Sequence, residues 1–70
     1  MTLKITPVIA DVLRQVEAGK SPYDMTVHSG AQITRTLNRC NDAGMFQWRN
    51  GKRQLTDAGR AALQQWENTQ

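Results

Sequence analysis

Residues 29–56 read SGAQITRTLNRCNDAGMFQWRNGKRQLT, and this stretch decides the fold. Ile33, Leu37 and Cys40 lie at i, i+4 and i+7, the spacing that places side chains on one face of a helix. The polar residues between them point elsewhere: Gln32, Arg35, Asn38 and Arg39. The pattern predicts a helix over residues 31–43 with one apolar face and one basic, amide-rich face.

A change of period after Gly44 predicts a β-hairpin. Gly44 suits the left-handed position that closes a helix. Beyond it Phe46 and Trp48 alternate with Gln47, and Asn50-Gly51 is a strong signal for a two-residue hairpin turn because both positions accept positive φ. The expected cross-strand pairs are Arg49 with Lys52, Trp48 with Arg53, and Phe46 with Leu55. The hairpin should therefore have a cationic tip and an apolar base.

Length and composition predict a single cytoplasmic domain. The 70 residues are enough for one small core but not for a large catalytic cavity. The one cysteine cannot form an intramolecular disulfide, and its place on the apolar stripe predicts a buried, reduced thiol. No apolar run approaches the roughly 18 residues of a membrane span, and no charged-then-apolar leader is seen. We expect neither membrane association nor export.

Positive charge is concentrated in the middle of the chain, although the formal net charge is only +3. Residues 1–28 carry three basic and three acidic side chains, whereas residues 29–60 carry six basic against two acidic ones, a net +4. This distribution favours a nucleic-acid footprint on the helix and hairpin. The alternative is that the basic residues only solvate one face.

Two further helix starts precede this stretch. Thr6 is expected to cap a first helix that Pro7 opens, and its apolar face consists of Val8, Ile9, Val12, Leu13 and Val16. Ser21-Pro22 repeats the signal for a second helix of a turn and a half to two turns before Ser29-Gly30. A short helix, a tight turn and a longer helix predict a helix-turn-helix, whose second helix enters the DNA major groove. Residues 1–5 form either a short strand or an arm over the core.

A last helix should follow the hairpin, with Thr56 as its cap. Its inward stripe consists of Gly59, Ala62, Leu63 and Trp66. Glycine inside a helix costs about 1 kcal/mol relative to alanine, so Gly59 indicates a close approach of another helix. Trp66 either covers the edge of the core or is a dimer contact. Residues 67–70 are expected to fray.

The run ITRTLNRCNDAGMF, followed by a basic hairpin and LTDAGRAAL, resembles winged helix-turn-helix domains, especially small bacterial and phage regulators and the MarR-like group. The resemblance covers about residues 6–66 and implies a mainly α fold with a three-helix core, a two-stranded wing and a closing C-terminal helix. It implies base reading by Gln32, Thr34, Arg35 and Asn38. It also implies backbone contacts by Ser29, Arg39, Arg49, Asn50, Lys52 and Arg53. The wing is short and the long MarR dimerisation helices are absent, so dimerisation is not implied.

These residue types suit double-stranded DNA on chemical grounds as well. Arginine can donate two hydrogen bonds to guanine, asparagine and glutamine can pair with adenine, and basic residues neutralise phosphates. We therefore expect a transcription regulator with helix 31–43 in the major groove and the 46–55 wing on the backbone. A homodimer is expected because so small a domain covers only a half-site. Trp48 either pairs with Arg53 as a cation–π contact or stacks on a base.

Enzymatic function is not expected. The chain has one histidine and one cysteine, with no zinc-ligand spacing, no glycine-rich phosphate loop and no serine beside a plausible base. No cofactor or metal is therefore predicted. The competing hypothesis is a phage or plasmid accessory protein that uses the same fold to bind a host protein. RNA binding is the weaker third alternative because aromatic residues are few.

Overall fold

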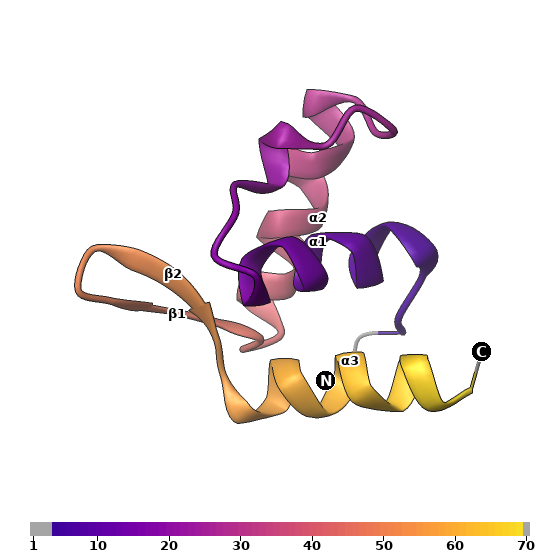
Figure 1. Cartoon of the computed structure of the whole chain (residues 1–70), viewed down its shortest axis with the longest axis vertical. Helices are drawn as coiled ribbons and strands as arrows, with labels where there is room; N and C mark the ends of the chain where they lie inside the picture. The colour runs from indigo at the N-terminus through magenta and orange to yellow at the C-terminus, as the bar shows by residue number, and fades with distance from the viewer. Residues whose placement is uncertain (1–3, 70) are drawn as a thin grey trace.

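The computed structural model describes residues 4–69 and is mainly helical, with one antiparallel hairpin. The elements in chain order are α1 (Pro7–Glu17), the 3-10 turn η1 (Pro22–Asp24), α2 (Gly30–Asp42), β1 (Phe46–Arg49), β2 (Lys52–Leu55) and α3 (Asp57–Asn68). Figure 1 shows α1 crossing α2, α3 running below them, and the hairpin projecting to one side. Within residues 4–69 no helix is long and apolar enough to cross a membrane.

The first helix begins as predicted. The Thr6 hydroxyl accepts a hydrogen bond from the Ile9 N–H at 3.4 Å, and Pro7 is the first helical residue. The buried residues of α1 are Ile9, Ala10, Val12, Leu13 and Val16. Val8, predicted on this face, is only half-buried. Residues 4–6 form no strand, and the rest of the predicted strand or arm lies outside the described residues.

The second predicted helix is only the single 3-10 turn η1. Ser21 caps it as expected, accepting from the Tyr23 N–H at 3.3 Å, but Met25 already has an extended backbone at φ −71° and ψ 139°. β-branched Thr26 and Val27 follow, and such residues lose side-chain freedom in a helix. Val27 is 75% exposed, so no core contact repays that cost.

The predicted range of the amphipathic helix is 31–43, and both ends of α2 lie one residue earlier in the chain. Ser29 is its N-cap, with the hydroxyl accepting from the Gln32 N–H at 3.2 Å. Its buried residues are Ile33, Thr36, Leu37 and Cys40. Thr36 was not predicted on this face. Its hydroxyl donates to the Gln32 carbonyl at 2.8 Å, which satisfies a polar group that would otherwise be costly to bury.

The hairpin has the predicted register. The cross-strand pairs are Phe46 with Leu55, Gln47 with Gln54, Trp48 with Arg53, and Arg49 with Lys52. Asn50 and Gly51 have φ values of 52° and 72°, the pair of positive angles that a type I′ turn requires. Phe46 and Leu55 are buried, so the base of the hairpin is part of the core.

The last helix packs closely against the start of the hairpin. Thr56 caps α3 by accepting from the Gly59 N–H at 3.2 Å, and its own hydroxyl donates to the Gly44 carbonyl at 2.6 Å. A Cβ added to Gly59 would lie 3.3 Å from the carbonyl carbon of Met45 and would overlap its oxygen. The predicted close approach at Gly59 is present, but its partner is the backbone of Met45 before β1 and not another helix. α3 continues to Asn68, past Glu67, where the sequence predicts fraying.

The only cysteine is fully buried, and burial raises the pKa of the Cys40 thiol from 9.0 to about 11. We expect iodoacetamide at about pH 8 to modify Cys40 in urea but not in the folded protein, because alkylation needs the exposed thiolate. Mass spectrometry measures the labelling.

The raised pKa of Cys40 also predicts a loss of stability at high pH. As pH rises, the Cys40 thiol loses its proton in the unfolded chain before it does so in the folded protein. Its contribution to the free energy of unfolding is therefore present below about pH 9 and should be lost between about pH 9 and 11. Urea melts over this pH range measure the loss of stability. Rapid labelling of the folded protein, or an equal loss of stability with pH in Cys40→Ala, would contradict these predictions.

Candidate nucleic-acid interface

The polar face of α2 is uncovered. Gln32, Arg35, Asn38 and Arg39 are all exposed. The opposite side of α2 carries Ile33, Leu37 and Cys40, which belong to the core cluster that contains α1. The exposed face is therefore turned away from α1, which crosses α2 on the other side in Figure 1. β1 packs against α2, so the hairpin leaves the globule beside this helix.

Thr34 is not a free hydroxyl. Its Oγ1 and the Tyr23 hydroxyl share a hydrogen bond of 2.5 Å, which joins η1 to the first half of α2. Tyr23 is 51% exposed, so its ring extends the surface that α2 offers. Tyr23 is not predicted from the sequence as a site residue, because a single aromatic residue after a cap has no periodic partner. The Ser29 hydroxyl accepts from α2 and can still donate its own hydrogen outward.

The basic residues of the hairpin lie on two faces. Side chains alternate along a strand, and Arg49 pairs with Lys52 on the same face as Gln47 and Gln54. Arg53 lies on the opposite face, which continues into the buried base of the hairpin. The predicted tip is therefore cationic on both sides, with Asn50 supplying the turn conformation between them.

Arg53 is held against two aromatic rings. Its guanidinium carbon lies 4.9 Å from the centroid of the Trp48 ring and 5.7 Å from that of Phe46. Such contacts contribute about 0.5–1 kcal/mol at exposed sites and stiffen the hairpin. The cation–π alternative for Trp48 is confirmed. The Trp48 side chain is still 63% exposed, so the contact leaves much of the ring open to solvent.

Trp66 and the single histidine, His28, lie elsewhere on the molecule. Trp66 is half-buried and packs against the edge of the core, which was one of the two alternatives predicted for it. His28 Nε2 lies 2.9 Å from Asp11 Oδ2, an interaction that ties α1 to the loop before α2. Among residues 4–69 there is no group of three histidine, cysteine, aspartate or glutamate side chains that could hold a metal ion.

Comparison with family models, curated proteins and solved structures finds no match for this chain. The interface is therefore defined by its own geometry. It consists of the exposed face of α2, the Tyr23 ring beside its N-terminal half, and the cationic hairpin that leaves from its C-terminal end.

Proposed function

We propose that this protein binds double-stranded DNA through α2 and the hairpin, as a small transcription regulator of the winged helix-turn-helix type. The observation that carries the proposal is the uncovered polar face of α2, with Gln32, Arg35, Asn38 and Arg39 opposite a buried, largely apolar stripe. An α-helix with its side chains is about 10–12 Å across and the major groove is about 12 Å wide, so this face can reach base edges.

The structure supports different roles for the exposed side chains of α2. Gln32 and Arg35 lie in its N-terminal half and carry the donors and acceptors that read bases. Arg39 lies one turn further on, nearer the hairpin, where a phosphate contact is the better fit. Thr34 shares its hydroxyl with Tyr23, so in this proposal Tyr23 and Thr34 act together as one polar contact.

On the hairpin, Arg49 and Lys52 are the proposed phosphate contacts. Both are exposed and lie on one face, next to the turn. Arg53 is half-buried against two rings, so its proposed contribution is a fixed positive charge on the other face. A homodimer with Trp66 at its contact would extend the footprint to two half-sites. A cytoplasmic, phage- or prophage-like regulator is consistent with this small, basic chain.

The salt dependence of duplex binding tests the proposal. Three neutralised phosphates, one each for Arg39, Arg49 and Lys52, give a slope of about −2.7, so affinity should fall about fortyfold between about 50 and 200 mM salt. Fluorescence anisotropy with a labelled duplex measures the change. Lys52→Ala should weaken all duplexes alike, whereas Arg35→Ala should reduce the preference among sequences selected from a random pool. Absence of any duplex binding at low salt would reject the proposal.

A partner protein is the second candidate, and one observation favours it. Trp48 is a large apolar side chain that is 63% exposed, on the hairpin face that also carries Arg53. Exposed tryptophan is enriched at protein interfaces. A host protein bound through this face would leave α2 free, so the two functions can be separated by experiment.

A further inference from the structure

A groove separates the C-terminal end of α1 from β2. Its volume is about 620 Å³, and Val16, Pro22 and Leu55 are among the residues that line it. Trp48 lines it as well. Figure 1 shows β2 on the side of the hairpin toward η1, with β1 beyond it. No residue of α2 is among the described residues that line the groove, so the groove is separate from the base-reading face of α2, although it shares Lys52 and Arg53 with the hairpin part of the proposed DNA interface.

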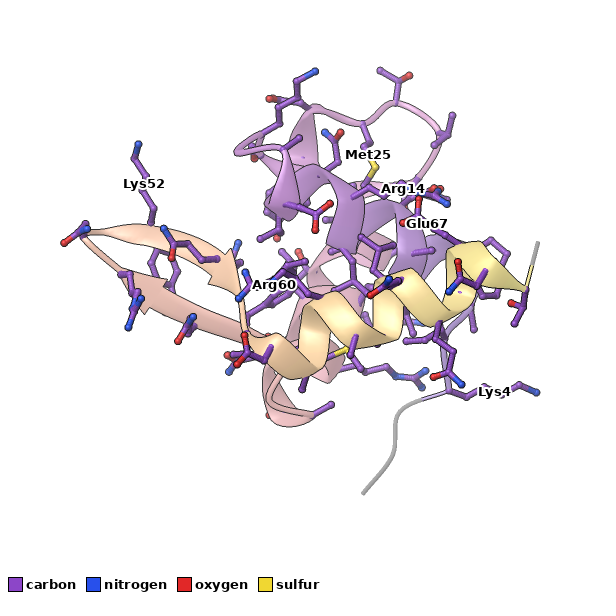
Figure 2. The ribbon with its side chains drawn as sticks, turned by 60° about the horizontal axis from the view of Figure 1, so that its bottom comes forward. Lys4, Arg14, Met25, Lys52, Arg60 and Glu67 are labelled. Carbon is purple, nitrogen blue, oxygen red and sulfur yellow. The ribbon has the colours of Figure 1, made fainter. Side chains whose placement is uncertain are left out.

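The lining of the groove is strongly cationic. It contains Lys20, Lys52, Arg53 and Arg60, against one acidic residue, Glu17. Arg60 is paired with Asp57 at 2.9 Å, but within residues 4–69 neither lysine has a carboxylate at ion-pair distance. Figure 2 shows Lys52 at the outer end of the hairpin and Arg60 at its base. The field along the groove therefore attracts an anionic partner.

The outer edge of β2 also offers main-chain groups. The Thr56 N–H donates to the Met45 carbonyl at 3.0 Å, which makes Met45 and Thr56 a hydrogen-bonded pair of the ladder. Hydrogen-bonded and non-hydrogen-bonded pairs alternate along an antiparallel ladder. The Trp48–Arg53 pair lies three positions further along the ladder, so it is a non-hydrogen-bonded pair. The N–H and C=O of Arg53 point away from β1. β2 has no second neighbour in the two-stranded sheet.

These features fit a peptide better than a nucleic acid. The outward carbonyl of Arg53 needs a hydrogen-bond donor, and a DNA backbone offers acceptors alone. The apolar atoms of Val16, Pro22 and Trp48 suit a hydrophobic side chain, and an extended chain can present such a side chain and carboxylates alternately.

We propose that the groove binds an extended acidic segment of a partner protein, which adds to the hairpin as a third strand along β2. The main chain of this segment pairs with the N–H and C=O of Arg53. Its carboxylates face Lys20 and Lys52, and an apolar side chain contacts Trp48. This site does not depend on DNA binding by α2.

NMR titration of the ¹⁵N-labelled full chain tests the proposal directly. The probe is a capped eight-residue peptide that alternates glutamate with valine. We expect saturable shifts at the Arg53 amide, the Lys20 amide and the Trp48 indole. A matched peptide with lysine in place of glutamate should not bind, because its charge is reversed. A peptide with proline in place of valine should not bind either, because it cannot pair as a strand.

Two variants locate the binding surface. Lys20→Glu is expected to weaken the peptide about five- to tenfold, since it reverses one charge in the groove. Lys4→Glu reverses the charge of another exposed lysine outside the groove and should leave the affinity unchanged. Equal binding of the three peptides, or equal effects of the two variants, would overturn the proposal. So would a DNA duplex that moves the groove amides while the acidic peptide leaves them unmoved.

Discussion

Gly59→Ala is expected to destabilise the protein by about 1–3 kcal/mol, although alanine is the better helix former by about 1 kcal/mol. The added methyl group would overlap the Met45 carbonyl oxygen, which is backbone and cannot rotate away. The same oxygen accepts the Thr56 N–H at 3.0 Å, so moving it also disturbs the start of α3. For a domain of this size the loss is a large share of the total stability.

Urea unfolding followed by circular dichroism measures this effect, with Ala61→Gly as the matched control. Ala61 is exposed on the same helix, so its replacement should cost only the propensity term of about 1 kcal/mol. A Gly59→Ala variant that is more stable than the parent would show that α3 can move away from Met45 at little cost. It would also contradict the packing role of Gly59.

The double variant Arg35→Ala/Arg39→Ala is expected to lower duplex affinity on the order of a hundredfold. Loss of one bidentate base contact costs about 1–3 kcal/mol, and loss of a phosphate contact adds to it. Both side chains are exposed on the polar face of α2, so the substitutions should leave the fold intact. Anisotropy titrations at one fixed salt concentration measure the change, and circular dichroism checks the fold.

Lys4→Ala/Arg14→Ala is the control for net charge. Like Arg35→Ala/Arg39→Ala, it removes two positive charges, but these lie on α1 and on the segment before it. Arg14 pairs with Asp11 at 3.2 Å and with Glu67 at 3.5 Å, but such exposed pairs contribute little to stability. Its duplex affinity should change only slightly. Equal losses in the two double variants would mean that net charge alone governs binding, and the assignment to α2 would be wrong.

Much of the candidate site could be predicted because its determinants are local. The apolar stripe of α2 implies an exposed opposite face, so Arg35 and Asn38 were expected on the surface, where they lie. The roles of these residues toward DNA stay predictions. What the sequence did not indicate is the hydrogen bond between Tyr23 and Thr34, which joins residues eleven positions apart across a turn.

Some contacts of the hairpin follow from its turn residues, and others do not. Asn50-Gly51 implied the turn and therefore the register, and the pairing of Trp48 with Arg53 followed. The approach of the Arg53 guanidinium to both Trp48 and Phe46 adds a diagonal contact that register alone does not specify. The groove beside β2 was not predicted, because it depends on where the end of α1 packs.

The sequence by itself determined the starts of α1 and α3, both ends of α2 to within a residue, and the hairpin register. These depend on caps, spacing and turn residues, whose effects extend over only a few positions. Tertiary structure alone decided that Thr36 is buried and that the hairpin and the end of α1 enclose a cationic groove. Those outcomes depend on contacts between segments distant in the chain, and such contacts exist only once the core has brought them together.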